Sequence, residues 1–133
     1  MLQTKSKLII RDNSGHTSGV VLGARRRGLA LGDTFSMVIT GRSSSRHRRG
    51  GNKRQGRPAP GRGMLVQSRQ PVVRYDGSSY RFALNGCVSL NRSAGGLSLG
   101  FRRIVGTVPY ELKRRRSALL NNANLPRLAR GAL

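Results

Sequence analysis

The 133 residues predict a mainly β protein: a small barrel of short strands in one domain, closed by a terminal helix. Five or six short apolar runs are separated by turn signals about every ten residues, which is typical of a small barrel. Near the C-terminus the apolar spacing becomes helical. The length suits one modest domain, so we treat 1–133 as a single unit.

The first forty residues contain three predicted strands. The run 8–10 is followed by the turn cluster Asp12-Asn13-Ser14-Gly15, and residues 20–22 form a second apolar run. In residues 34–40, Phe35, Met37 and Ile39 alternate with Ser36, Val38 and Thr40. This period of two predicts a half-buried strand.

A fourth strand is expected from Met64 to Tyr75, with a hairpin turn at Asp76-Gly77. A two-residue turn would pair Tyr75 with Ser78 and Val73 with Tyr80. One face of the hairpin would then be apolar and aromatic, carrying Val73, Tyr75, Tyr80 and Phe82. The other face would carry Val72, Arg74, Ser79 and Arg81. We therefore expect this hairpin to bury its aromatic face.

The last elements are two short strands and a helix. Val88 and Leu90 continue the strand pattern, and alternation returns over 97–101. A helix is predicted near 108–121, with Thr107 as its N-cap and Pro109 in its first turn. Cys87, on a strand, is expected to be a small half-buried core residue.

The segment from Arg42 to Gly63 reads RSSSRHRRGGNKRQGRPAPGRG and holds eight positive charges without an acidic residue. Because predicted strands flank it, we interpret it as a basic loop projecting from the barrel. Its Gly and Ser content predicts disorder in the free protein and ordering on a polyanion.

Charge indicates the class of partner. Lys and Arg total 26 against four acids, a formal net charge of +22, which favours nucleic acid. The longest aliphatic runs are far too short to span a bilayer, so we expect no membrane association. The basic clusters supply the candidate RNA-binding residues. These are Arg25, Arg26, Arg27, Arg42, Arg46, Arg48, Arg49, Lys53, Arg54, Arg57, Arg62, Arg74, Arg81, Arg102, Arg103, Lys113, Arg114, Arg115 and Arg116.

The sequence gives little support for catalysis. Asp12, Asp33 and Asp76 lie in turn contexts, and Glu111 lies in the first turn of the predicted helix, so each acid has a structural explanation. One Cys and two His residues do not form a zinc site with sensible spacing. We expect a protein that is not an enzyme and that has no cofactor or metal.

Only six aromatic residues are present, and most fall on the apolar phase of a strand. They are too few to supply both a core and a platform for stacking bases. Contacts to the phosphates and shape of folded RNA fit the composition better.

Four ordered motifs carry a resemblance to a known family. They are Asp12-Asn13-Ser14-Gly15; Val21-Leu22-Gly23 with Arg25-Arg26-Arg27 and Gly32-Asp33; Gly63-Met64-Leu65-Val66 with Asp76-Gly77, Phe82, Asn85 and Val88; and Arg103-Ile104-Val105-Gly106 with Val108, Glu111 and Leu112. Together they resemble the universal large-subunit ribosomal protein fourteen over most of residues 1–116. Ser89 departs from the family by replacing an aliphatic residue, and the segment 42–63 is longer and more basic than the family's loop.

The resemblance implies a five-stranded barrel with a projecting ribbon and small C-terminal helices. It also implies a structural role at the interface side of the large ribosomal subunit. The implied partners are large-subunit rRNA, two neighbouring large-subunit proteins and, across an intersubunit bridge, small-subunit rRNA. A ribosome silencing factor docks on this family in bacteria and mitochondria, and its contact would fall around residues 111–116.

The sequence leaves two questions open: whether the protein belongs to a ribosome, and in which compartment it acts. A free RNA-binding barrel or RNA chaperone acting away from ribosomes would have the same composition. The chain starts where the family usually starts, which suits a bacterial or organelle-encoded protein, including a plastid one. Shortage of acids and the enlarged basic loop favour a mitochondrial ribosome.

Overall fold

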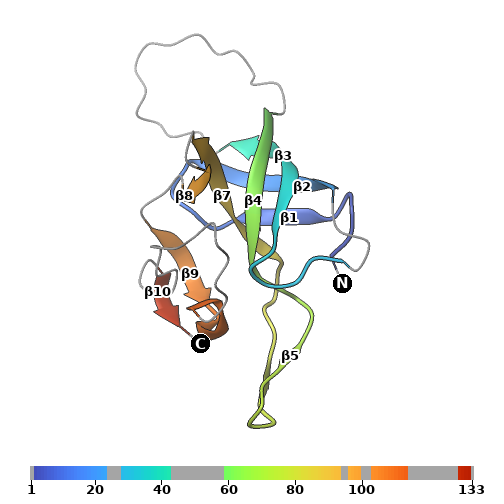
Figure 1. Cartoon of the computed structure of the whole chain (residues 1–133), viewed down its shortest axis with the longest axis vertical. Coiled ribbons are helices and arrows are strands. Elements are labelled where there is room, and N and C mark those ends of the chain that lie inside the picture. The colour runs from blue at the N-terminus through green and yellow to red at the C-terminus, as the bar shows by residue number, and fades with distance from the viewer. Residues whose placement is uncertain are drawn as a thin grey trace.

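Five strands form a closed barrel in the computed structural model, which describes residues 2–23, 28–42, 59–93, 96–99, 103–113 and 129–132. The barrel strands are β1 (Lys7–Ile10), β2 (His16–Gly23), β3 (Thr34–Arg42), β4 (Ala59–Gln67) and β7 (Gly86–Ser93). They pair antiparallel in the order β1-β2-β3-β4-β7, and β1 closes the barrel by pairing parallel with β7 (Figure 1). The predicted five-stranded β-barrel is confirmed.

The remaining elements lie outside the barrel wall. A short hairpin, β5 (Val72–Val73) and β6 (Ser79–Tyr80), extends from one end, and β8 (Gly96–Leu99) pairs with β7 (Figure 1). β9 (Ile104–Val108) leads into the 3-10 helix η1 (Tyr110–Lys113). β10 (Ala129–Ala132) returns to pair parallel with β9.

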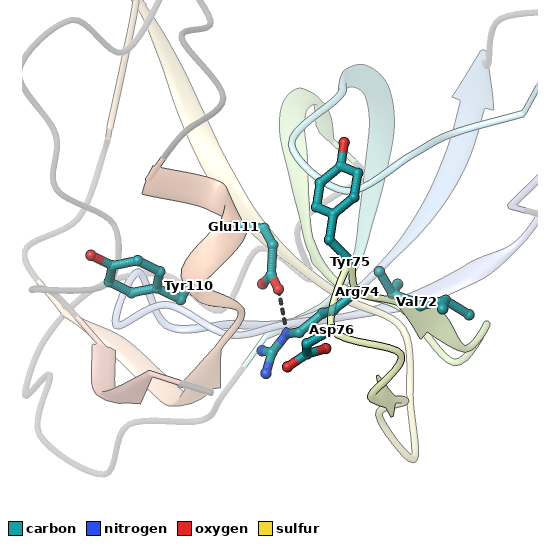
Figure 2. Close-up of a pocket in the computed structure, with 7 residues that line it drawn as sticks. Val72, Arg74, Tyr75, Asp76, Tyr110 and Glu111 are labelled. Atoms are coloured by element: carbon teal, nitrogen blue, oxygen red, sulfur yellow. Dashed lines mark hydrogen bonds and ion pairs between the residues drawn. The ribbon is translucent and has the colours of Figure 1, made fainter.

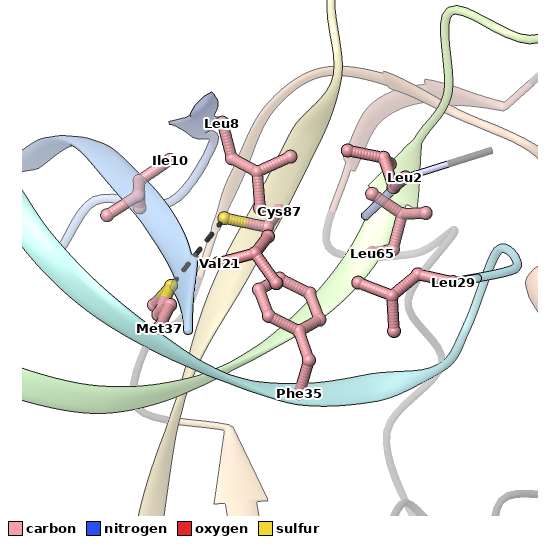
Figure 3. Close-up of a cluster of buried hydrophobic side chains, with 9 residues drawn as sticks. All are labelled: Leu2, Leu8, Ile10, Val21, Leu29, Phe35, Met37, Leu65 and Cys87. Atoms are coloured by element: carbon pink, nitrogen blue, oxygen red, sulfur yellow. Dashed lines mark hydrogen bonds between the residues drawn. The ribbon is translucent and has the colours of Figure 1, made fainter. Parts of the chain in front are cut away.

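The barrel interior is filled by one apolar cluster to which every barrel strand contributes (Figure 3). Its buried members are Leu2, Leu8, Ile10, Val21, Leu29, Phe35, Met37, Leu65 and Cys87. Cys87 is completely buried, with its Sγ 3.9 Å from Met37 Sδ. Burial raises the pKa of Cys87 to about 12, with a smaller effect from the charge of Asp12, so the residue is a neutral thiol at physiological pH. The prediction of a core cysteine is confirmed, with deeper burial than expected.

A second apolar cluster covers the outer face of β4 and β7. Met64, Val66, Val88 and Leu90 pack there against Ile104, Val108 and Leu112 from β9 and η1. Strands β4 and β7 are therefore buried on both faces, which explains the uninterrupted apolar run at residues 64–66. The C-terminal elements are fixed to the barrel by this contact.

Strand β4 begins earlier than the sequence predicted. The expected start was Met64, but pairing with β3 already begins at Ile39↔Ala59 and continues to Thr34↔Met64. Residues 59–63 were assigned to the basic loop because Pro60 and two glycines are untypical of a strand. The correction is that only residues 43–58 can form that loop, and they lie outside the described residues. The expected strand 64–75 is also interrupted, because β4 ends at Gln67 and β5 begins at Val72.

Gly63 shows why a glycine belongs in β4. A Cβ at this position would lie 3.0 Å from Met37 Sδ and 3.2 Å from Phe35 Cζ, inside the barrel. We expect Gly63→Val to lower the free energy of unfolding by about 1–3 kcal/mol through overpacking. Urea denaturation measures this. Gly61→Val is the matched control, because a Cβ there meets only Ile39 at an ordinary 3.4 Å; equal losses in both variants would contradict the packing argument.

A helix was predicted near 108–121, and the prediction that it begins at Val108 is wrong. Val108 is the last residue of β9 and is buried against the barrel wall. Contacts with the segment that follows β1 keep this part of the chain extended. Arg11 O accepts a 2.7 Å hydrogen bond from Val105 N, and Ile104 forms an isolated antiparallel β-bridge with Asp12. The described helical segment is the single 3-10 turn of η1, and residues 114–121 lie outside the described part of the chain.

The β5–β6 hairpin forms where predicted, but its register differs by one residue. The observed pairs are Val72↔Tyr80 and Val73↔Ser79. Arg74 N also donates a 2.8 Å hydrogen bond to Ser78 O, so the loop has three residues, 75–77, and ends with Gly77 at φ +81°. Asp76 Oδ1 accepts hydrogen bonds from both Ser78 N and Ser78 Oγ. This is the three-residue hairpin with a left-handed last residue.

The register change places Tyr80 on the same face as Val72 and Arg74, because a shift of one residue moves every side chain of one strand to the opposite side relative to its partner. The predicted buried face is wrong: Val73 is 72% exposed and Tyr75 is fully exposed. Arg74, expected on the solvent side, instead lies over the Tyr80 ring at 4.7 Å. Tyr80 and Phe82 do pack together, edge to face, at 5.9 Å.

Candidate nucleic-acid interface

Exposed arginines lie on several elements of the described structure. Of the predicted RNA contacts, the structure describes the side chains of Arg62 on β4, Arg74 and Arg81 in the hairpin region and Arg103 before β9. Arg62, Arg81 and Arg103 are exposed. Arg42 ends β3 and Lys113 ends η1, which places their backbones only. The other predicted contacts lie outside the described residues. They are Arg25, Arg26, Arg27, Arg46, Arg48, Arg49, Lys53, Arg54, Arg57, Arg102, Arg114, Arg115 and Arg116.

One group of cations lies near the ends of β3 and β4 that lead to residues 43–58. Arg62 pairs with Leu90 across β4 and β7, and Arg92 follows two residues later on the same strand. Because side chains alternate along a strand, Arg62 and Arg92 share one face, and both are exposed. Arg42, paired with His16, ends the neighbouring strand. Arg42, Arg62 and Arg92 therefore belong to the end of the barrel where the basic segment 43–58 connects β3 to β4.

Arg92 was not among the predicted contacts. The signal was available, since Val88, Leu90 and Arg92 continue one alternation from the buried wall to solvent. Arg69 was also missed: it is exposed, and its backbone N donates a 2.8 Å hydrogen bond to Asn85 Oδ1. It follows a buried strand end, where sequence alone gives no reason to single it out.

Arg74 differs from the other described candidates because the fold itself uses its guanidinium. Its Nε donates a 2.5 Å hydrogen bond to Glu111 Oε1, which joins the hairpin to η1. Tyr80 donates its hydroxyl to the other oxygen, Glu111 Oε2, at 3.2 Å. Burial, followed by the charge of Glu111, raises the pKa of Tyr80 to about 12, so the phenol keeps the proton that it donates.

The same contacts keep Glu111 ionised. Partial burial alone would raise the pKa of Glu111, but the hydrogen bond from Arg74 opposes this, with further help from a backbone hydrogen bond, the Arg74 charge and Tyr80. The net effect is a pKa below its ordinary value. A lowered folded-state pKa stabilises the fold above the ordinary pKa, and this stabilisation is lost as the pH falls through the folded value.

We therefore expect the effect of Glu111→Gln to depend on pH. Near neutrality the variant should melt at a slightly lower temperature than the parent, since both partners are partly exposed and the pair is partly screened. The two melting curves should converge as the pH falls below the ordinary value of 4.5. Differential scanning fluorimetry from pH 3 to 7 measures this. The exposed substitution Leu22→Ser is the control, and a difference for Glu111→Gln that stays constant with pH would contradict the linkage.

The three aspartates also have structural partners. Asp33 Oδ2 accepts from Ala30 N at 2.9 Å, and Asp76 caps the hairpin turn. Asp12 caps the turn at Ser14 N and, with its other oxygen, accepts from Ser89 N at 2.7 Å and Ser89 Oγ at 2.5 Å. The turn roles predicted for the three aspartates are confirmed, and Asp12 has an additional long-range role. Glu111 lies in the first turn of η1, and its carboxylate is bound by Arg74 and Tyr80. Within the described ranges, no cluster of three potential metal ligands occurs and no helix is long and apolar enough to cross a membrane.

Comparison with protein families decides the kind of protein. The family model for ribosomal protein L14p/L23e matches residues 1–125. The chain belongs to the L14p/L23e family.

Membership in the L14p/L23e family makes the chain a structural constituent of the ribosome, a kind of protein that is not enzymatic. It also implies binding to ribosomal RNA and to other ribosomal proteins. The Ser89 departure now has a physical explanation, because its hydroxyl and backbone N both donate to the buried carboxylate of Asp12. An aliphatic side chain at this position would provide only the backbone donor.

Proposed function

We propose that this L14p/L23e protein is a structural component of the large ribosomal subunit that binds large-subunit rRNA through its arginine-rich segments. Binding would occur by phosphate neutralisation and fit to folded RNA, with bidentate arginine contacts positioning the barrel. The basic segment 43–58, together with Arg62, Arg81 and Arg103, would contribute most of these contacts.

The observation that carries this proposal is that the chain does not neutralise itself. It has 26 basic residues and four acids, so ion pairs within the chain, such as Arg74 with Glu111, can neutralise only a small part of the positive charge. Asp12 and Asp33 are engaged by backbone and hydroxyl donors, and Asp76 caps its own turn. The large excess of positive charge therefore requires an external polyanion, and rRNA is the polyanion of a ribosome.

The position that we propose within the ribosome follows from what the family resemblance implies. We propose a position at the subunit interface, beside two large-subunit proteins and in a bridge to small-subunit rRNA. A silencing factor would contact the region 111–116, where the exposed Tyr110 lies alongside. We favour a mitochondrial ribosome over a plastid or bacterial one, because the chain combines few acids with an enlarged basic segment.

Sedimentation tests the proposal against a free RNA-binding barrel or RNA chaperone. On a sucrose gradient in moderate salt, the tagged chain should sediment with large subunits. A chain that stays in the light fractions would overturn the proposal and support the free RNA binder. Mass spectrometry of peptides from purified organelles would decide the compartment.

A further inference from the structure

A groove of about 760 Å³ lies between the β5–β6 hairpin and η1. It is lined by residues 72–76 from the hairpin and by Tyr110 and Glu111 from η1 (Figure 2). These two segments are far apart in the sequence, and the Arg74–Glu111 ion pair joins them. The groove is separate from the two apolar clusters that stabilise the barrel.

The described lining of this groove has a charge opposite to that of the chain. Two of the four acids in the protein, Asp76 and Glu111, line it with one arginine, Arg74, so the described lining residues carry a formal charge of −1 in a chain of +22. The hydrogen bond from the Ser78 side chain, followed by that from the Ser78 backbone N, lowers the pKa of Asp76. The pKa of Glu111 is lowered as well, so both acids are ionised at neutral pH. Arg74 is held by Glu111 and lies over Tyr80, which reduces its availability to a phosphate.

The groove also exposes apolar and aromatic side chains. Val73 is 72% exposed, Tyr75 is fully exposed and Tyr110 is 49% exposed. Figure 2 shows Tyr75 and Tyr110 on opposite sides of the charged group formed by Arg74, Asp76 and Glu111. Exposed aromatic rings beside a hollow are typical of protein-binding surfaces, because they bury a large area at small cost in conformational entropy.

These features disfavour RNA as the occupant. A base could stack on Tyr75, but its phosphates would then lie close to two carboxylates. A Lys or Arg side chain of a protein would instead be attracted by the same two carboxylates. The two hydrogen bonds from Ser78 both go to Asp76 Oδ1, so Oδ2 can receive one from a Lys or Arg side chain.

We propose that this groove docks a segment of another protein that carries a Lys or Arg next to aliphatic or aromatic side chains. The cation would lie at Asp76 and Glu111, and the apolar side chains would cover Val73, Tyr75 and Tyr110. The inference goes beyond rRNA binding and does not depend on it, since none of the groove contacts requires RNA.

Site-specific photocrosslinking tests the proposal in the assembled complex. The full chain carries Tyr75→p-benzoylphenylalanine and is irradiated in every gradient fraction that contains it, so that its place of assembly is measured separately from groove occupancy. We expect an adduct with a protein segment, mapped by mass spectrometry to a residue beside a Lys or Arg. The same probe in place of Leu22, which is 53% exposed on β2, is the control for nonspecific labelling. An adduct with RNA at position 75, or a protein yield no higher than at position 22, would overturn the proposal.

A charge substitution at Val73 keeps the test independent of folding, because this side chain is mostly exposed. In the chain that carries the probe at position 75, Val73→Lys should lower the yield of the protein adduct at least about fivefold, since it places a like charge against the incoming cation. Val73→Glu should leave the yield unchanged or raise it. Equal yields from the two variants would overturn the assignment of a basic partner.

Discussion

Replacing the basic side chains between residues 43 and 58 with serine is expected to flatten the salt dependence of RNA binding by several units. Each phosphate that the protein neutralises contributes about 0.7–0.9 to the slope of log affinity against log salt, because bound counterions are released. Six substitutions, at Arg46, Arg48, Arg49, Lys53, Arg54 and Arg57, would remove up to about four to five units if each side chain contacts one phosphate. Filter binding to a large-subunit rRNA fragment over a range of KCl concentrations measures the slope.

The matched control replaces the five arginines of this set with lysine and leaves Lys53 in place. Charge is then unchanged, so the slope should stay close to that of the parent, while affinity falls wherever bidentate arginine contacts are lost. Arg42 and Arg62 are left intact in both variants, because they belong to β3 and β4. A serine variant with an unchanged slope would show that this segment contacts no phosphate and would move the RNA interface to the barrel.

Substituting Asp12 should have the largest effect on stability. Asp12 is 7% exposed, and its carboxylate accepts hydrogen bonds from Ser14 and from two donors of Ser89, which lies on β7. Asp12→Ala leaves the buried N–H and hydroxyl of Ser89 without their acceptor, and each such loss costs about 1–3 kcal/mol. We expect the free energy of unfolding to fall by about 3 kcal/mol, as measured by urea denaturation followed by circular dichroism.

Two smaller substitutions test the cause of that loss. Asp12→Asn keeps one acceptor oxygen and should cost less than Asp12→Ala. Ser89→Ala removes only the hydroxyl donor and should cost about 1 kcal/mol. An Asp12→Ala variant no less stable than Ser89→Ala would contradict the assignment of Asp12 as the link between the end of β1 and β7.

The barrel was predictable because its signals are local. Alternation in residues 34–40 marked the buried side of β3, and the turn cluster at 12–15 marked the end of β1. These patterns depend on the two-residue period of a strand, which a short window of sequence shows completely. Family motifs then added the number of strands. The excess of basic residues is equally plain in the sequence, and with it the polyanionic class of partner.

The errors occurred where distant groups compete with local preference. Val108 fits helical spacing, but burial against β4 and β7 and the pairing of β9 keep it in a strand. The Asp76-Gly77 turn was predicted, yet its register was one residue off. A two-residue and a three-residue loop suit the same Asp-Gly pair, and the observed register is the one that places Arg74 between Tyr80 and Glu111.

The candidate sites divide in the same way. Positive charge is a property of composition, so the basic segments could be identified without coordinates. The buried contact of Asp12 with Ser89 spans 77 positions, and the groove joins residues 72–76 to 110–111; no local pattern predicts either one. Strand periodicity and charge are carried by neighbouring residues, whereas the partners of a buried carboxylate and the walls of a groove depend on how the closed barrel brings distant segments together.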